Sequence, residues 1–148
     1  MDSRKGITRD EIVNCALEAC ETKFKHQGRV VGLGLDCAGL YVFVCQRLGI
    51  PHRDAQGYPR TPFDGELERQ MDAQPSLQRI AVSEAQKGDI LLMRMTKQPQ
   101  HIAIHAGEYR GHSYVIHASE QHGKVCVHRL DSTWFGRVVR AYRFEEVQ

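Results

Sequence analysis

The residue with the clearest chemical potential in this 148-residue chain is Cys37, which follows Asp36 at the start of an apolar segment. Asp36 is a favourable N-cap, and Gly49 with Pro51 would end the segment, so a helix is predicted between them. Apolar residues recur at helical spacing there, namely Leu40, Tyr41, Val44, Cys45 and Leu48. A thiol in the first turn lies near unpaired N–H groups and the positive end of the helix dipole. We therefore expect a lowered pKa, a nucleophilic thiolate and preferential alkylation at Cys37; the alternative is a small buried apolar residue.

A cysteine nucleophile needs a base, and the base needs a residue that orients it. Strand alternation in residues 101–105 puts His101 and His105 on one face. If that segment forms a hairpin with residues 113–118, His117 reaches the face of His101. Cys37, His101 and His117 therefore have the residue types of a thiol hydrolase site. Zinc binding by His101 and His105 with a cysteine is a weaker alternative, because H-x-x-x-H spacing suits a helix and this segment reads as a strand.

Composition and charge argue against several classes of protein. The net charge of +2, with scattered basic residues, does not favour a nucleic-acid partner. No segment approaches the roughly 18 apolar residues of a membrane span, and no signal peptide is recognised, so we expect cytoplasmic synthesis and no membrane insertion. The five cysteines are odd in number and form no C-x-x-C pair, which predicts reduced thiols. Five of the eight histidines are expected to play no special role, namely His26, His52, His112, His122 and His128.

The order of the predicted elements indicates one α+β domain over residues 1–148, with N-terminal helices packed on a C-terminal antiparallel sheet. A capping box at Thr8–Glu11 opens a helix whose apolar face contains Ile12, Val13, Ala16, Leu17, Cys20 and Phe24. Residues 52–78 are polar and contain several prolines, which predicts a surface excursion that borders the cleft or contacts a partner, with a short helix near residues 66–74. Replacing residues 57–65 by a short linker should then leave the fold intact. Five runs read as strands, at residues 89–95, 101–106, 113–118, 124–130 and 137–144.

Four segments, LDCAGLYVFVCQRLG, KGDILLM, HIAIHAG and YVIHAS, resemble in their order the motifs of the NlpC-type cysteine peptidases, a papain-like family of cell-wall hydrolases. The resemblance implies a papain-like fold with Cys37 as nucleophile, His101 rather than His105 as base, and His117 as the residue orienting the base. It implies hydrolysis of an amide bond in peptidoglycan stem peptides, with the bond between γ-D-glutamate and the diamino acid expected, and no metal or organic cofactor. The alternatives are a peptidoglycan amidase of the related family and a structural tail-tip or assembly protein with a vestigial or protein-directed site.

Within that family, residues 24–28 resemble the compact forms encoded by tailed phages. This likeness implies a virion tail protein that acts in the host periplasm or cell wall, with phage tail-tip proteins as partners. Many relatives carry a tyrosine about a dozen residues before the cysteine that lines the oxyanion site, and here His26 stands closest. In relatives, a serine follows the cysteine and, together with the preceding aspartate, helps to recognise the amino end of a stem peptide. Here Ala38 stands in place of that serine. Asp36 is therefore either a substrate ligand or only a helix N-cap.

Overall fold

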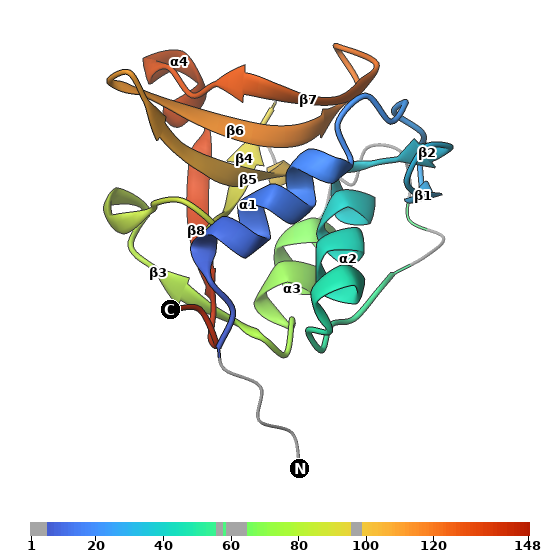
Figure 1. The fold of residues 1–148 in the computed structure, drawn as a ribbon, viewed down its shortest axis with the longest axis horizontal. Helices are drawn as coiled ribbons and strands as arrows, with labels where there is room; N and C mark the ends of the chain where they lie inside the picture. Colours follow the sequence, from blue (N-terminus) through green and yellow to red (C-terminus); the bar gives the residue numbers. More distant parts are fainter. Residues whose placement is uncertain (1–5, 56–57, 59–64, 96–98) are drawn as a thin grey trace.

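The computed structural model describes residues 6–55, 58, 65–95 and 99–148, and they form a layered α+β fold (Figure 1). The helices are α1 (Arg9–Glu18), α2 (Cys37–Leu48), α3 (Glu66–Asp72) and α4 (Ser132–Phe135), with a 3-10 turn at Val82–Glu84. The strands are β1 (Arg29–Val30), β2 (Gly34–Leu35), β3 (Leu77–Ile80), β4 (Ile90–Arg94), β5 (Pro99–Tyr109), β6 (His112–Ser119), β7 (Lys124–Arg129) and β8 (Val138–Phe144). The expected fold class is therefore confirmed.

The main sheet has the order β3-β8-β4-β5-β6-β7, and each neighbouring pair is antiparallel. All five strands predicted from the sequence are present in it. Strand β3 was not predicted. Its four residues Leu77–Ile80 lie at the sheet edge, and only Leu77 and Ile80 are partly buried, so no alternating pattern shows in the sequence. The short pair β1–β2 and helix α4 were also missed, since neither is long enough to show a periodic pattern.

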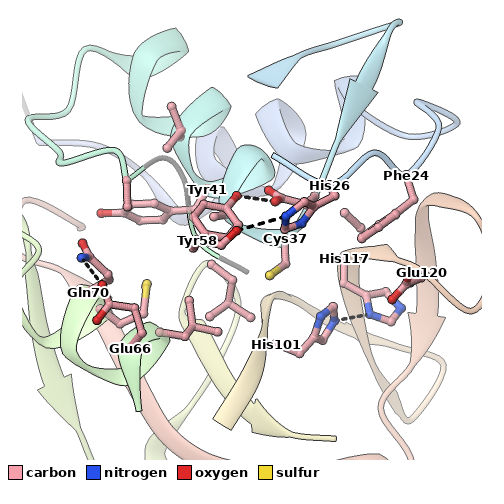
Figure 2. Close-up of a pocket in the computed structure, with 18 of the residues that line it drawn as sticks. Phe24, His26, Cys37, Tyr41, Tyr58, Glu66, Gln70, His101, His117 and Glu120 are labelled. Carbon is pink, nitrogen blue, oxygen red and sulfur yellow. Dashed lines mark hydrogen bonds between the residues drawn. The ribbon is translucent and has the colours of Figure 1, made fainter. Parts of the chain in front are cut away.

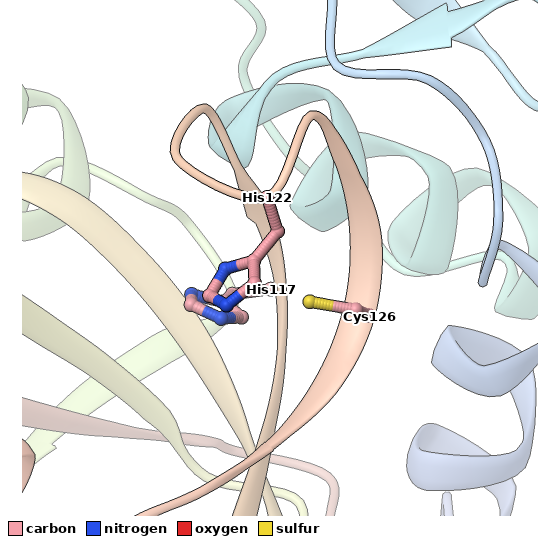
Figure 3. Close-up of side chains that lie close together, drawn as sticks. All are labelled: His117, His122 and Cys126. Atoms are coloured by element: carbon pink, nitrogen blue, oxygen red, sulfur yellow. The ribbon is translucent and has the colours of Figure 1, made fainter.

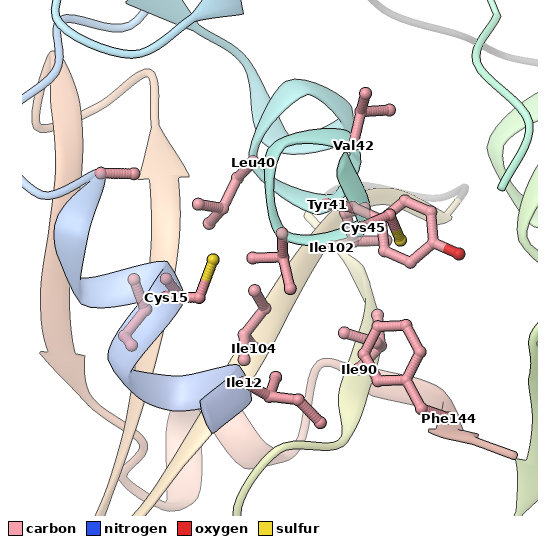
Figure 4. Packing of buried hydrophobic residues seen from close by; sticks show 14 of the residues in the cluster. Ile12, Cys15, Leu40, Tyr41, Val42, Cys45, Ile90, Ile102, Ile104 and Phe144 are labelled. Atoms are coloured by element: carbon pink, nitrogen blue, oxygen red, sulfur yellow. The ribbon is translucent and has the colours of Figure 1, made fainter. Parts of the chain in front are cut away.

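Helices α1 and α2 cover one face of the sheet and bury the larger apolar cluster against it (Figure 4). Side chains of the two helices, such as Ile12 and Leu40, pack there on strand residues such as Ile102 and Ile104. The opposite face carries a smaller cluster in which Trp134 of α4 packs with Leu91, Met93, Ala103, Val115, Leu130 and Ala141. His101 alternates with Ile102, so its side chain belongs to the second face.

Helix α1 is shorter than its apolar pattern predicts. Its capping box is confirmed, because Thr8 Oγ1 accepts from the Glu11 N–H at 3.0 Å and Glu11 Oε1 accepts from the Thr8 N–H at 2.9 Å. The helix ends at Glu18, however, and Leu17 is 42% exposed. Beyond it the chain turns back along β7, where the Phe24 N–H donates to the Gly123 carbonyl at 2.8 Å. Residues 21–24, which the local pattern assigned to the helix, therefore form backbone hydrogen bonds with residues 123–125 instead.

Residues 65–78 lie largely at the surface and border a pocket, as expected, but the segment also contributes to the core. Helix α3 confirms the predicted short helix, but Met71, Gln74 and Ser76 are buried. Gln74 Oε1 accepts hydrogen bonds from the Tyr41 hydroxyl at 3.1 Å and from the Arg53 N–H at 3.0 Å. Polar composition suggested exposure throughout, whereas Gln74 and Ser76 are buried and partners within the protein satisfy their polar groups. Residues 57 and 59–64 of the proposed linker replacement lie outside the described residues.

A buried carboxylate joins the N-terminal helix to the sheet. Asp89, which precedes β4, is fully buried and lies 3.1 Å from Arg9 Nη1 of α1 and 2.9 Å from Arg143 Nη2 of β8. Its Oδ2 also accepts from the Gln86 N–H at 2.9 Å. Several charged hydrogen bonds offset the cost of burying this charge, and they fix α1 against β4 and β8.

Candidate active site

The start of α2 holds Cys37 in a rigid position. Asp36 caps the helix, and its Oδ1 accepts from the Gly39 N–H at 2.8 Å. A Cβ on Gly39 would lie 2.1 Å from the carbonyl oxygen of Gly28, so only glycine fits there. The Gly28 segment therefore packs directly against the first helical turn and holds the backbone of Cys37 in place.

Both carboxylate oxygens of Asp36 are engaged within the protein. Besides the Gly39 cap, Asp36 Oδ1 accepts from Arg29 Nη1 at 2.9 Å, and Oδ2 accepts from the Gln27 N–H at 2.8 Å. The Tyr58 hydroxyl donates a further hydrogen bond to Oδ2. Only 5% of Asp36 is exposed. These contacts support the N-cap alternative, with Asp36 as the residue that joins the 26–29 segment and Tyr58 to the helix start.

Tyr58 is a site residue that sequence reasoning missed. Its hydroxyl accepts from Arg29 Nη2 at 2.8 Å as well as donating to Asp36, and its ring lines the pocket that contains Cys37. Tyr58 lies in a polar segment without periodicity, so the only available signal was a lone aromatic residue in a loop.

Replacing Tyr58 by phenylalanine should destabilise the protein by about 1–3 kcal/mol, because a buried carboxylate and a guanidinium each lose a partner. The effect is measured as a lower denaturant midpoint at unchanged slope. Tyr109→Phe is the matched control, since Tyr109 is 61% exposed. Equal midpoints for the two variants would show that the Tyr58 hydroxyl contributes nothing to stability. Replacing residues 57–65 by a linker removes Tyr58 and should lower the free energy of unfolding by at least as much. This reverses the expectation from sequence that the replacement leaves the fold unaffected.

Strands β5 and β6 bring His101 and His117 together. Their register pairs Ile104 with Ile116 and His105 with Val115, and it therefore places both histidines on the same face, as predicted. His101 Nε2 lies 2.8 Å from His117 Nδ1. His101 is 8% exposed and His117 is fully buried. The hydrogen bond leaves Nδ1 of His101 as the nitrogen available for another partner.

Cys37, His101 and His117 line one pocket with a volume of about 460 Å³, large enough for a short peptide segment. Figure 2 shows the Cys37 thiol and the His101 ring directed into this pocket, with His117 beside His101. Residues from α3, including Glu66 and Gln70, line the other end. The three residues predicted for catalysis thus come from α2, β5 and β6 to one place.

The expectation of an acidic Cys37 thiol is wrong for the free protein. Burial raises the pKa of Cys37 to about 12, and the nearby Asp36 carboxylate raises it further. The N–H groups of Ile102 and Ala38 oppose this shift without cancelling it. The thiol is therefore neutral at neutral pH, and alkylation in mild acid should not favour Cys37 over the other four cysteines.

The two paired histidines are also neutral. Burial lowers the pKa of His101 to about 4. Burial, followed by the charges of His101, His128 and His122, lowers the pKa of His117 to about 3. A neutral imidazole beside a neutral thiol can accept its proton, whereas an imidazolium could not.

His105 does not take part in this site. Its Nδ1 accepts from the Gly107 N–H at 2.9 Å, and it is absent from the residues that line the pocket. The zinc alternative built on His101 and His105 is not supported either. Within the described residues, the group of side chains close enough to share a metal ion is His117, His122 and Cys126.

His26 lines the pocket and lies edge-on to the Tyr58 ring. Its Nε2 lies 3.1 Å from the Tyr58 carbonyl oxygen and 3.4 Å from the side-chain nitrogen of Gln27. The expectation that His26 lines the oxyanion site stays a prediction. The N–H of Cys37, in the first turn of α2, has no acceptor in the described part of the chain and is free to donate to a ligand.

Comparison with known proteins extends these observations. The model of the NlpC/P60 family matches residues 21–143. A crystal structure of the NlpC/p60 domain of the peptidoglycan hydrolase SagA is 26% identical, with a TM-score of 0.61, over 91% of this chain and 97% of that one. No curated protein gives a significant match.

Two further crystal structures share the fold. A Staphylococcus aureus protein similar to lipoprotein, of the NLP/P60 family, is 23% identical with a TM-score of 0.64, over 97% of this chain and 45% of that one. An NlpC/P60 family protein from Bacillus cereus is 17% identical with a TM-score of 0.67, over 94% of this chain and 41% of that one. The chain thus spans less than half of these two proteins. The likenesses confirm the expected papain-like α+β fold. No helix in the described residues is long and apolar enough to cross a membrane.

Proposed function

Since the chain belongs to the NlpC/P60 family, whose members include peptidoglycan hydrolases, we propose that it hydrolyses the amide bond between γ-D-glutamate and the diamino acid of peptidoglycan stem peptides. The observation that carries the proposal is the pocket lined by Cys37, His101 and His117, with the two histidines 2.8 Å apart. A cysteine with an oriented imidazole in a peptide-sized pocket is suited to acyl transfer.

The reaction begins from a neutral thiol and a neutral imidazole. His101 donates its Nε2–H to His117 Nδ1, so its own Nδ1 is unprotonated and accepts the Cys37 proton as sulfur attacks the substrate carbonyl. The Cys37 N–H stabilises the oxyanion at the helix start. His101 then returns the proton to the departing amine, which leaves a thioester. Water attacks the thioester while His101 takes one of its protons. The C–S bond then breaks, the sulfur recovers that proton from His101, and the carboxylic acid product leaves and ionises in solution.

The rate should be nearly independent of pH between about pH 5 and 9. The reactive pair holds one proton, and it gains a second only as the pH falls towards the lowered His101 pKa of about 4. It loses its proton only near the raised Cys37 pKa of about 12. We expect kcat/KM for a soluble stem peptide, measured with a chelator present, to show no acid limb near the ordinary histidine pKa of about 6.5. A clear loss of rate between pH 7 and about 6 would contradict the neutral pair.

Mass spectrometry of purified muropeptides after incubation tests the bond assignment. Hydrolysis at γ-D-glutamate leaves a shortened peptide on the sugar and frees a fragment whose new amino terminus belongs to the diamino acid. An amidase of the related family would instead release the whole peptide from the sugar. Cys37→Ser serves as the inactive control. No new product from any muropeptide would favour a structural or protein-directed role.

For the biological setting, we propose separately that the protein is a tail-associated enzyme that reaches the cell wall on a virion. Its support is the resemblance of residues 24–28 to phage-encoded forms. Immunogold labelling of particles released from the strain that carries the gene should place the protein at the tail tip. Particles without label, with the protein found only in cells, would contradict this setting.

A further inference from the structure

A buried nitrogen beside the candidate active site has no hydrogen-bond partner. His117 is fully buried, and its Nδ1 is occupied by His101. Among the described residues, the buried side-chain polar atoms without a partner are His117 Nε2 and His128 Nδ1. A buried polar atom without a partner costs roughly 1–3 kcal/mol, so its presence beside a reactive pair calls for a physical reason.

Two further ligand-type side chains lie next to His117 (Figure 3). Cys126 of β7 is the cross-strand partner of His117, so both project from the same face of the sheet. His122 comes from the exposed turn between β6 and β7. The ligand atoms of His117, His122 and Cys126 lie within 4.8 Å of one another.

The surroundings of His122 suit a metal ligand. Its Nδ1 lies 2.8 Å from Ser119 Oγ, so this nitrogen is held by a hydrogen bond and Nε2 is the one that can bind a metal. Ligating histidines characteristically use their second nitrogen in this way. Because His122 is in an exposed turn, it can close the site to the separations of about 3.6 Å that tetrahedral Zn–N and Zn–S bonds require.

We propose that His117 Nε2, His122 and Cys126 bind Zn²⁺ or a similar divalent cation, and that its binding switches off the Cys37–His101 pair. Two imidazole nitrogens and one thiolate form a ligand set for such a cation, with water as the fourth ligand. His117 belongs to both sites, through Nδ1 to His101 and through Nε2 to the metal.

The switch follows from the tautomers of the two histidines and rests on the function proposed above. A metal on His117 Nε2 leaves the proton of the neutral ring on Nδ1, which then donates to His101 Nε2. His101 must in turn carry its proton on Nδ1, the nitrogen that should accept from Cys37. The base is therefore blocked while the metal is bound, without any movement of the backbone.

Binding can be tested without any substrate. Co²⁺ added to the metal-free protein should give a thiolate-to-cobalt charge-transfer band, and Zn²⁺ should displace it. Cys126→Ser should abolish the band, and His122→Ala, at an exposed position, should weaken affinity at least about tenfold. Cys20→Ser and Cys37→Ser are matched controls that should keep the band. No band in the wild type, or loss of the band in Cys37→Ser but not in Cys126→Ser, would overturn the site.

The inhibitory effect is tested on the same variants. Zn²⁺ should inhibit muropeptide hydrolysis by the wild type, and the inhibitory concentration should rise at least about tenfold in His122→Ala and Cys126→Ser. Both variants should keep wild-type rates with a chelator present, because neither residue contacts the reacting atoms. Equal inhibition of wild type and both variants would overturn the switch, since the ion would then act directly at Cys37. A protein without hydrolytic activity would still show the cobalt band, so failure of the proposed function is distinguishable from failure of the metal site.

Discussion

Replacing His101 by alanine is expected to lower kcat/KM by on the order of 10⁴- to 10⁶-fold, whereas His105→Ala should leave it within a few-fold. The two histidines lie on the same face of β5, four residues apart, which corresponds to about 13 Å along a strand. Only His101 lines the pocket with Cys37 and contacts His117. The measurement is steady-state hydrolysis of a purified muropeptide.

His105→Ala is the matched control for this experiment, because His105 is equally buried on the same strand and its loss tests for structural damage. Its effect should be confined to stability, through the lost hydrogen bond to the Gly107 N–H. His117→Ala should fall between the two, since it removes an orienting residue and leaves the base. If the His105 variant were inactive and the His101 variant active, the role of base would have to be assigned to His105.

Replacing Cys37 by serine should abolish hydrolysis while leaving the melting temperature almost unchanged. The two side chains have nearly the same shape, so the packing at the start of α2 is kept. A hydroxyl needs a stronger base than a thiol does, and a His101 whose pKa is lowered to about 4 is a weak one. The expected loss of kcat/KM is again at least about 10⁴-fold, since the nucleophile and its base act as a unit.

Cys20→Ser is the control for this variant, because Cys20 follows α1 and does not line the pocket. It should keep full activity. Circular dichroism and the denaturant midpoint of the Cys37 variant should match the wild type. Substantial turnover by Cys37→Ser would exclude Cys37 as the nucleophile and would require another residue of the pocket in its place.

The amino-acid sequence by itself determined the local elements and the candidates for chemistry. Capping residues fixed the start of α1 at Thr8 and of α2 at Asp36, because caps act within a few residues of the chain. Strand alternation placed His101 and His117 on one face, since side-chain direction in a strand follows the backbone alone. Four motifs in order along the chain, from the one at Cys37 to the one at His117, were sufficient to indicate the family, which the match over residues 21–143 confirms.

Tertiary structure alone decided the properties that depend on surroundings. The helix start predicted an acidic Cys37, but burial by segments far away in the sequence raises its pKa instead. The Tyr58 hydroxyl donates to Asp36, and the β6–β7 turn brings His122 beside His117. Neither Tyr58 nor His122 stood out from its neighbours in the sequence. Local sequence encodes backbone conformation and residue type, whereas desolvation and side-chain contacts arise only when distant segments pack together. The protonation states of Cys37 and His101 are therefore a property of the packed fold.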